Sequence, residues 1–376
     1  MKITETTPKS DDFYMPAEYS EHDGTLMIFP DRPGSWRDDA LPAALVFTEI
    51  IEQIAKDESV YVLCNSRVRK RAEQYISKIP NVFLLDIPQD DAWARDTGPT
   101  FVRNQQGIVR GIDWKFNAWG GDFDGLYSDY ENDNRVASTF CEHLHTDCYD
   151  AQHFVLEGGS IHTDGEGTIL VTETCLLSQG RNPQMTKEQI SDMLCQYLGG
   201  EKVIWLPCGI YNDETNEHVD NVCSFISPAE VVLAWTDNVD DPQYLMSKAC
   251  YDFLMEQSDA KGRKFVVHKL PIPDVPICFT ADDIAGMTFA EGEDTREIGE
   301  RLAASYVNFY FTNHSVLLPQ FGGENRISDE RALNIMRKLC PNRTVVPIPA
   351  IELIKGGGNI HCLTQQIPKG AILCEK

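Results

Sequence analysis

Apolar residues in this chain come in short runs, and at five places two such runs flank a polar or glycine-containing turn. These places are 25–30 with its neighbours, 99–114, 160–172, 222–235 and 306–319. Two short apolar runs around a tight turn are typical of a β-hairpin. The sequence therefore predicts five hairpins; one is FVRN and GIVRGIDW, which share the turn at 105–107.

Most of the predicted hairpins lead on to a stretch with apolar residues at helical spacing. The expected helices are Leu41–Ala55, Val136–Leu144, Thr186–Leu198, Pro242–Met255 and Ser328–Leu339. Thr186 with Gln189 three residues later is a capping-box pattern. Ser328 is expected to begin its helix in the same position, although Arg331 stands where a glutamate would fit better.

A further apolar run follows each helix, so the repeating unit is a hairpin, a helix and a strand, about five times over. The runs are VYVLC, FVLEGG, KVIWL, KFVVHKL and TVVPIP. A repeat that cannot cover its own apolar faces must pack against its neighbours, so we expect a closed ring with a single core. The alternative is a doubly wound α/β sheet, against which the tight hairpins count.

Charge and cysteine content narrow the possible partners and the compartment. The chain has 33 Lys and Arg against 58 Asp and Glu, a net charge of −25. Such a surface repels nucleic acid and anionic lipid and attracts small cations, amines and guanidines among them. No segment approaches a membrane span of about 20 apolar residues, and the N-terminal segment lacks a secretory apolar region. The twelve cysteines include no CxxC pair, which favours reduced thiols in a cytoplasmic protein.

The segment 356–366, GGGNIHCLTQQ, carries the strongest chemical signal. Three glycines let the backbone turn sharply or approach a ligand, and Cys362 directly after them is a candidate nucleophile. The alternative is an ordinary buried thiol. Adjacent side chains of an extended strand point to opposite faces, so His361 is expected to be structural and not the base for Cys362.

A histidine and three carboxylates occupy comparable places in the repeat. If 214–221 is extended, His218 and Asp220 share one face, as acid–base chemistry or metal binding would require. Asp96 precedes a Gly-Pro turn and Glu157 ends an apolar run, and the steps from Asp96 to Glu157 and from Glu157 to His218 are both 61 residues. A core hydrogen bond or an Asx turn explains each residue singly, but not their repetition. Equivalent positions converge on the axis of a ring, which predicts one central site containing Asp96, Glu157, His218, Asp220 and Cys362.

This set of side chains matches no common metal site. Zinc takes mainly histidine and cysteine ligands, and calcium takes oxygen without a thiol, so no metal is expected. Paired carboxylates do suit guanidinium, because they accept its fixed N–H donors in pairs. Cys362 would then attack the guanidinium carbon from above its plane, and water would finally replace sulfur.

Together these motifs resemble the agmatine deiminases of the guanidino-group-modifying, or pentein, superfamily, over residues 13–366. The strings that carry the resemblance are DDAWARDTGP, KFNAWGGDFDGLY, FVLEGGSIHTDGEGT, GRNP, HVDN and GGGNIHCLTQQ. The resemblance implies a five-bladed α/β propeller of ββαβ units with pseudo-fivefold symmetry, in a single domain over 1–376. It also implies conversion of agmatine and water to N-carbamoylputrescine and ammonia, a step of polyamine biosynthesis. No metal or organic cofactor is implied, and a homo-oligomer is expected.

The resemblance also implies roles for individual residues. Cys362 corresponds to the nucleophile, His218 to the general acid/base and Glu157 to the carboxylate that works with it. Asp96 and Asp220 correspond to the pair that holds the guanidinium nitrogens. Trp93 is expected to form a wall against the substrate methylenes, the alternative being an ordinary core tryptophan.

Two departures from the family pattern and two alternative functions stay open. Glu217 stands where the family usually has glycine, and 128–133 lacks the family's usual Trp-Asp-containing string. Arginine or peptidyl-arginine deimination would require a cation for the substrate's carboxylate; Arg95 should point away from Asp96, and Arg181 is expected to be a structural turn residue. A catalytically silent cation-binding protein would have no use for Cys362.

Overall fold

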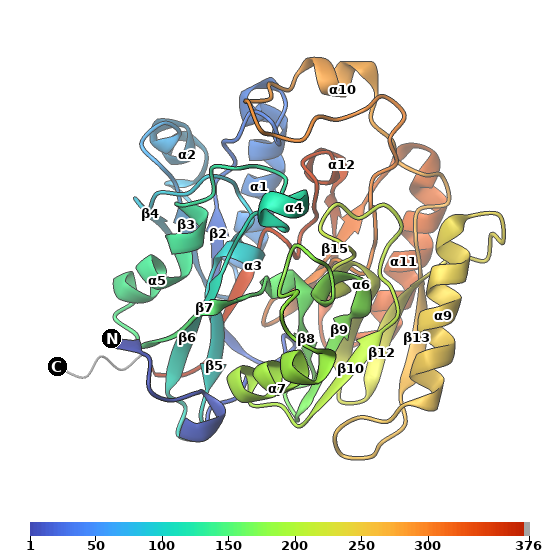
Figure 1. Ribbon diagram of the computed structural model, residues 1–376. Coiled ribbons are helices and arrows are strands. Elements are labelled where there is room, and N and C mark those ends of the chain that lie inside the picture. The colour runs from blue at the N-terminus through green and yellow to red at the C-terminus, as the bar shows by residue number, and fades with distance from the viewer. Residues whose placement is uncertain (372–376) are drawn as a thin grey trace.

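The computed structural model describes residues 1–371, which contain five separate β-sheets (Figure 1). In spatial order within each sheet, the strands are β1 (Lys2–Ile3), β7 (Cys148–Val155), β6 (Val109–Lys115) and β5 (Thr100–Arg103); β10 (Lys202–Leu206), β9 (Thr168–Thr172) and β8 (His162–Thr163); β11 (Cys223–Ser227), β12 (Glu230–Trp235) and β13 (Val266–Pro271); β14 (Tyr310–Phe311), β15 (Ser315–Gln320) and β16 (Thr344–Pro349); and β17 (Gln365–Pro368), β2 (His22–Ile28), β3 (Ser59–Leu63) and β4 (Val82–Leu85).

Each sheet contains an antiparallel pair followed by a parallel strand. The pairs β5/β6, β8/β9, β11/β12 and β14/β15 are antiparallel, and β7, β10, β13 and β16 then add in parallel. Four predicted hairpins are thereby confirmed, and the doubly wound alternative is wrong, because the strands do not form one parallel sheet.

The remaining predicted hairpin, at 25–30, forms differently from the expectation. Strand β2 pairs antiparallel with β17, from the opposite end of the chain, with Leu26 opposite Gln365. Strand β3 then adds to β2 in parallel. A partner nearly 340 residues away cannot be found by local pattern, and this pairing joins the first sheet to the last described segment.

Five helices lie between an antiparallel pair and its parallel third strand, as predicted. They are α1 (Leu41–Ile54), α5 (Asp133–His143), α7 (Lys187–Leu198), α9 (Pro242–Glu256) and α11 (Arg326–Leu339), and Figure 1 shows α5, α7, α9 and α11 towards the outside of the molecule. The capping box of Thr186 and Gln189 is confirmed. The predicted start at Ser328 is wrong: α11 begins at Arg326, and the Ser328 hydroxyl is buried, where Tyr306 donates to it.

Shorter helices complete the described chain, and several of them carry the functional side chains. They are α2 (Arg69–Ile76), α3 (Ala94–Thr97), α4 (Gly121–Asp124), α6 (Glu173–Leu176), α8 (Val219–Val222), α10 (Ala281–Ala285) and α12 (Ile351–Ile354), with 3-10 turns η1 (Lys9–Asp11), η2 (Asp38–Ala40), η3 (Gly158–Ser160) and η4 (Gly323–Asn325).

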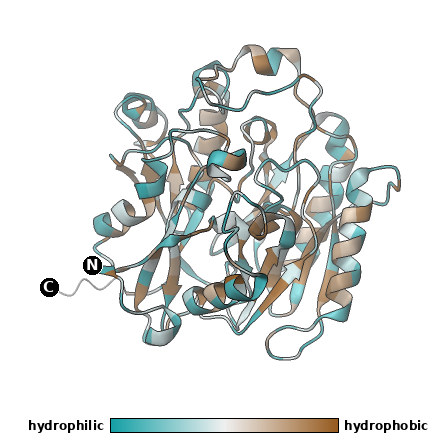
Figure 2. Cartoon of the chain, in the orientation of Figure 1, coloured by the Kyte–Doolittle hydropathy of each residue, from teal (hydrophilic) through white to brown (hydrophobic). Residues whose placement is uncertain are grey.

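Buried apolar side chains form two clusters, where the sequence predicted a single core. The larger cluster includes Phe47 from helix α1, Leu233 from strand β12 and Leu317 from strand β15. The smaller one joins Phe13, Trp114 and Leu194. The division arises because α7 and the strands β6, β7 and β9 pack among themselves with the N-terminal segment. In Figure 2 the most apolar colours lie on the strands and on parts of the helices.

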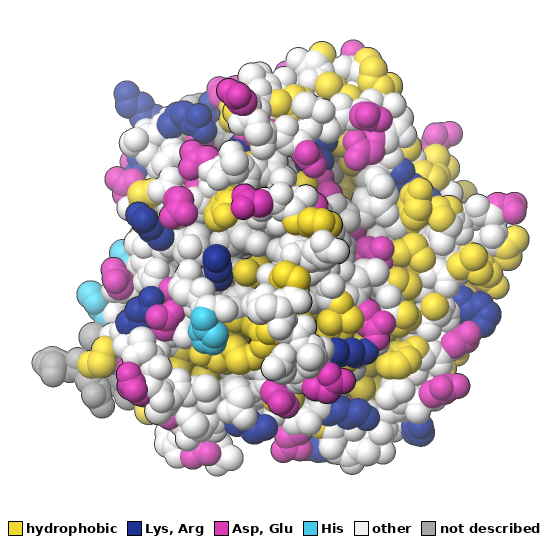
Figure 3. Space-filling model, in the orientation of Figure 1, with side chains coloured by type: hydrophobic (Ala, Val, Ile, Leu, Met, Phe, Trp, Pro, Cys, Tyr) yellow, Lys and Arg dark blue, Asp and Glu magenta, His cyan; other side chains and the backbone are white. Residues whose placement is uncertain are grey.

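Surface charge is mixed on the face seen in Figure 3, where acidic and basic side chains are interspersed. The eleven cysteines within 1–371 are all free thiols, while Cys374 lies outside the described residues. Within the same range, no helix combines the length and the apolarity needed to cross a membrane.

Candidate active site

A cavity that opens to solvent brings together residues from distant parts of the sequence. Trp93, Asp96, His218 and Cys362 line it, and Glu157 and Asp220 are buried at its side, next to His218. The predicted convergence of these residues on one place is therefore observed.

The residues reach the cavity from equivalent positions, each just before the first strand of a sheet unit. Asp96 lies in α3 before β5, Glu157 precedes η3 and β8, His218 precedes α8 and β11, and Cys362 lies in the turn before β17. The condition that 214–221 is extended is not met throughout, since its last three residues belong to the helical turn α8, and Asp96 likewise lies in a helical turn, α3. The equal spacing in sequence nevertheless corresponds to equal placement in space.

His218 lies between two carboxylates. Its Nε2 is 3.7 Å from Glu157 Oε2, and its Nδ1 is 4.0 Å from Asp96 Oδ2. Burial disfavours the charged imidazole, but Asp96, Cys175 and Glu157 outweigh burial and hold the pKa of His218 well above its ordinary value. The site therefore favours the imidazolium form of His218, which can give a proton to a leaving group.

Arg181 fixes the ionisation of Glu157. Its Nε is 2.8 Å from Glu157 Oε1, and both side chains are fully buried. Burial opposes the charge on Glu157, but Arg181 and His218 overcome it and lower the pKa of the carboxyl group. Arg181 was expected to have only a structural role in a turn; it does lie in a turn, but it also contacts the carboxylate beside His218. It is not free to bind a substrate anion.

Asp96 is oriented by two hydrogen bonds from residues that are remote in sequence. Trp119 Nε1 donates to Oδ2 at 2.9 Å, and the Gly159 amide donates to Oδ1 at 2.8 Å. Burial raises the pKa of Asp96, and nearby Asp220 and Glu157 add to the effect although His218 opposes it. Trp119 holds its indole there from a left-handed backbone, with φ of +65°, a conformation that non-glycine residues adopt mainly where function or context demands it.

Asn308 holds the sulfur of Cys362 in place. Its Nδ2 donates to Cys362 Sγ at 3.2 Å, and its Oδ1 accepts the His361 amide at 3.0 Å. The carboxylate Oδ2 of Asp220 lies 3.7 Å from the same sulfur. Burial, Asp220 and Asp96 together raise the pKa of Cys362 well above its ordinary value, which favours the protonated thiol.

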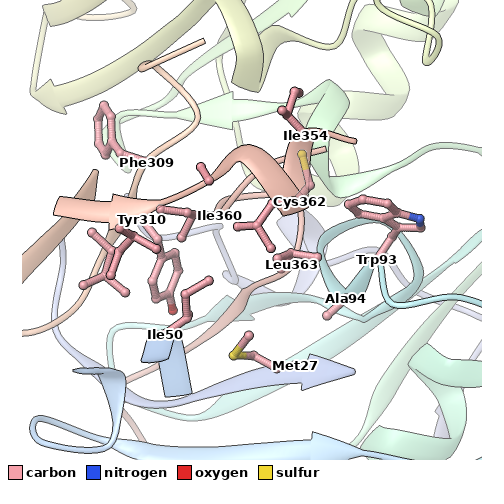
Figure 4. Close-up of a cluster of buried hydrophobic side chains, with 14 of the residues drawn as sticks. Met27, Ile50, Trp93, Ala94, Phe309, Tyr310, Ile354, Ile360, Cys362 and Leu363 are labelled. Atoms are coloured by element: carbon pink, nitrogen blue, oxygen red, sulfur yellow. The ribbon is translucent and has the colours of Figure 1, made fainter. Parts of the chain in front are cut away.

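The glycine run before Cys362 is explained by close packing and by backbone conformation. Gly357 has φ of +114°, and a Cβ on Gly358 would collide with the Trp93 ring and lie 3.1 Å from the Cβ of Cys362. Trp93 lines the cavity, and Figure 4 shows it beside Cys362. Ile360 and Leu363, both fully buried, anchor this turn in the core.

His361 is bonded to a carboxylate at each ring nitrogen. Nδ1 lies 2.9 Å from Asp220 Oδ2, the oxygen that is also 3.7 Å from the Cys362 sulfur, and Nε2 lies 2.8 Å from Glu18 Oε2. Arg95 turns away from Asp96, as expected, and pairs with Glu18 at 3.1 Å. The expected cause was an extended strand, whereas the observed cause is the helical turn α3.

The two departures from the family pattern lie beside the cavity. Glu217 has φ of +68°, which explains why glycine is common at this place. Its Oε2 accepts the Gly209 amide at 2.6 Å, so the carboxylate is held beside that loop. In segment 128–133, buried Asp133 accepts the Tyr127 hydroxyl at 2.6 Å. Tyr127 lines the cavity and stacks under Arg32, so this segment shapes the mouth.

Two buried groups could in principle supply metal ligands, namely Glu18, His162 and His361, and Glu157, Cys175 and His218. Each group contains a carboxylate that an arginine already pairs: Arg95 with Glu18, and Arg181 with Glu157. A metal cation in either place would lie beside a guanidinium group, which disfavours it.

Carboxylates outnumber cations in the cavity lining. Arg32 and Arg296 are the two arginines there, and each forms an ion pair, with Glu293 and Glu214 respectively. The five lining carboxylates are Asp91, Asp96, Glu214, Glu293 and Asp294.

Sequence reasoning missed four contributors: Glu18, Trp119, Asn308 and the pairing role of Arg181. Trp119 lies in one of the strings that carry the family resemblance, and Glu18 lies near the start of the range 13–366 that the resemblance covers; no other feature of the sequence marks either residue. Asn308 lies in the apolar segment 306–311, where a lone buried amide is the available signal.

The sequence and the fold of this chain are similar to those of known deiminases. Residues 14–368 match the profile of the Porphyromonas-type peptidyl-arginine deiminase family. A Selenomonas ruminantium protein named "Putative agmatine deiminase" is 59% identical over 98% of this chain and 99% of its own. The solved structure of Enterococcus faecalis agmatine deiminase is 42% identical, covers 98% of this chain and 99% of its own, and has a TM-score of 0.93. A cysteine-to-serine variant of C. jejuni agmatine deiminase with substrate bound is 26% identical, covers 95% and 97%, and has a TM-score of 0.80.

Proposed function

Because this chain belongs to the Porphyromonas-type peptidyl-arginine deiminase family, we propose that it hydrolyses agmatine to N-carbamoylputrescine and ammonia. The observation that carries the proposal is the cluster of Asp96, Asp220 and His218 around the Cys362 thiol at one cavity. Two carboxylates beside a thiol form a receptor for a guanidinium cation whose carbon the sulfur can attack.

Substrate binding would activate the nucleophile. Guanidinium donates N–H groups to Asp96 and Asp220, whose charges otherwise oppose a thiolate. Its positive charge compensates them, so the pKa of Cys362 falls and the thiol proton leaves to solvent through the open cavity. The thiolate then forms a bond to the guanidinium carbon, giving a neutral tetrahedral adduct.

His218 would handle the protons of the remaining steps. The imidazolium protonates one adduct nitrogen, the C–N bond breaks, and ammonia leaves an S-alkylthiouronium cation on Cys362. Neutral His218 then accepts a proton from the attacking water, and the C–S bond breaks to release the carbamoyl product and the thiolate. Water's second proton is lost to solvent. Glu157, held ionised by Arg181, stabilises each imidazolium state of His218.

The charge of the cavity supports agmatine over arginine. The two substrates share the guanidinium group, but arginine adds an α-carboxylate, and an unpaired buried charge costs several kcal/mol. Arg32 and Arg296 are both paired with carboxylates. Trp93 supports the apolar methylenes from one side of the cavity.

An ammonia-release assay tests the proposal by comparing agmatine with arginine and a peptidyl-arginine. We expect kcat/KM to be at least about tenfold higher for agmatine, which corresponds to about 1.4 kcal/mol. Equal kcat/KM values for arginine and agmatine would support the deiminase chemistry but refute the assignment of agmatine as the preferred substrate. No release from any of them would favour the silent binding protein. Exhaustive chelation should leave the agmatine rate unchanged.

We also infer that the five sheets form the blades of an α/β propeller with pseudo-fivefold symmetry, in one domain over 1–376. The repeated antiparallel pair with its parallel third strand and the β17–β2 pairing support this inference. The eleven free thiols support a reducing, cytoplasmic location. A homo-oligomer rests on the family resemblance alone.

A further inference from the structure

The buried groups behind Asp220 form a continuous chain of alternating charge that the proposed chemistry does not use. It runs from Asp220 to His361, then to Glu18 and Arg95, with contacts of 2.9, 2.8 and 3.1 Å. All four side chains are at most 3% exposed. Buried ions are costly unless every one is paired, so an arrangement of this kind at a reaction centre calls for a functional explanation.

His361 can satisfy both neighbours only as a double donor. Its two ring nitrogens each face a carboxylate oxygen, and a neutral ring would have one N–H for two acceptors. Burial and Arg95 oppose the charged ring, but Glu18 and Asp220 overcome them and raise the pKa of His361. The ring is therefore an imidazolium bridging two carboxylates, which fixes it in one orientation.

The hydrogen bond from His361 determines which oxygen of Asp220 is free to bind a ligand. Oδ2 of Asp220 accepts from His361 and lies 3.7 Å from Cys362 Sγ, whereas Oδ1 is buried with no hydrogen-bond partner among the described residues. A carboxylate oxygen without a donor, beside the nucleophile, is placed to accept from a guanidinium N–H. Burial alone would protonate Asp220, and His361 is the principal group that opposes it and lowers the pKa of the carboxyl group.

Glu18 completes the chain from the N-terminal segment. It accepts from His361 and Arg95 and lies 3.5 Å from His162 Nε2. Without Glu18, the Arg95 guanidinium would face the imidazolium directly, since Arg95 opposes the charge on His361. Glu18 thus separates two cations and makes the charged form of His361 possible.

We propose that His361 and Glu18 are positioning residues, which hold Asp220 ionised with one oxygen directed at the substrate's guanidinium group. The inference rests on the proposed deiminase function and adds two residues to its machinery. Neither residue touches the reacting atoms; His361 acts through Asp220, and Glu18 acts through His361. The segment containing Phe13 to Glu18, which carries the family resemblance, thereby gains a role at the site.

The test uses His361→Gln and Glu18→Gln, with His268→Gln as the control. His268 in β13 also bonds a carboxylate through a ring nitrogen, Glu230 at 2.6 Å, but neither His268 nor Glu230 lines the cavity. We expect His361→Gln to lower kcat/KM for agmatine by about ten- to a hundredfold and to raise KM. This is the loss typically seen in other enzymes when a residue that orients a ligand-binding group is removed. The acidic limb of its pH profile should move to higher pH, because Asp220 then holds its proton more tightly. Glu18→Gln should act in the same direction and less strongly, and His268→Gln should stay within about twofold of the wild type.

A second readout separates this inference from the proposed substrate. Alkylation of Cys362 by the cation chloroacetamidine reports a correctly held Asp220 whether or not agmatine is turned over. His361→Gln and Glu18→Gln should slow it, and His268→Gln should not. An unchanged pH profile and alkylation rate in His361→Gln, or an equal loss in His268→Gln, would overturn the inference. If His361→Gln does not fold, the isosteric Glu18→Gln decides alone. A wild type inactive on agmatine but showing this alkylation pattern would refute only the substrate.

Discussion

The resting state of Cys362 leads to a prediction about two nearly isosteric alkylating reagents. Chloroacetamidine carries a positive amidinium group, and chloroacetamide carries a neutral amide in its place. Cys362 Sγ lies 3.7 Å from Asp220 Oδ2, and both Asp220 and Asp96 raise the pKa of the thiol. A cation bound between these carboxylates should assist thiolate formation, whereas the neutral reagent gives no such assistance.

The size of the effect follows from the distance. Two unit charges about 4 Å apart interact by about 4 kcal/mol at an effective dielectric constant of about 20. A third of that energy, about 1.4 kcal/mol, is already a factor of ten in rate. We therefore expect chloroacetamidine to inactivate the protein at least about tenfold faster than chloroacetamide, after each rate is divided by the rate with a small free thiol at the same pH.

Asp220→Asn supplies the decisive control, because the two reagents should respond in opposite directions. Loss of the carboxylate removes a charge that opposes the Cys362 thiolate, so chloroacetamide should react faster. The same change removes half of the cation receptor, so chloroacetamidine should react more slowly. Inactivation rates and mass spectrometry of the labelled peptide measure both. A normalised preference near one, or rates that move together in Asp220→Asn, would refute the electrostatic account of Cys362.

Three further predictions concern the nucleophile, the mouth of the cavity and its adjoining loop. Cys362→Ser should retain less than about 5% of the agmatine rate with little change in Tm, because a hydroxyl is a far weaker nucleophile. Cys340 is buried to the same extent, at 8% exposure, and Cys340→Ser should stay active. High activity in Cys362→Ser would assign the attack to another group. Burial raises the pKa of Asp133 to about 8, so the stability gained from protonating this carboxyl group is fully present below about pH 4 and is lost as pH rises through 8. The Tm of the wild type relative to Asp133→Asn should therefore fall by at least about 2 °C between pH 5 and 9, and a constant difference would contradict the assignment. Glu217→Gly should relieve about 1 kcal/mol of left-handed backbone strain, and it should lose the hydrogen bond from the Gly209 amide, which is worth a similar amount. The free energy of unfolding, measured in urea, should therefore change by no more than about 1 kcal/mol. A larger loss would mean that the Glu217 side chain has another role.

The positions of the reacting residues were readable from the sequence because the repeat makes them equivalent. Asp96, Glu157 and His218 are separated by equal steps, and each precedes the first strand of its sheet unit. Pattern alone gave the correct neighbourhood but the wrong local conformation, since α3 and α8 are single helical turns. A four-residue turn is too short to show helical periodicity in its apolar positions.

Contacts between distant segments could not be predicted in the same way. Glu18 and His361 are 343 residues apart, and neither has a periodic pattern that points to the other. Trp119 depends on a left-handed φ, which is unusual for tryptophan and leaves no mark in composition. The single expected core became two clusters, because hydrophobic spacing shows which face of an element is buried but not against which neighbour.

The pairing of β17 with β2 has a consequence for the order in which the protein is made. Strand β2 leaves the ribosome nearly 340 residues before its antiparallel partner, residues 365–368. The turn that carries Cys362 directly precedes β17, so the nucleophile arrives with the strand that completes the first sheet. A nascent chain that ends before residue 362 lacks the proposed nucleophile, so the reaction can begin only after β17 has been made and has paired with β2.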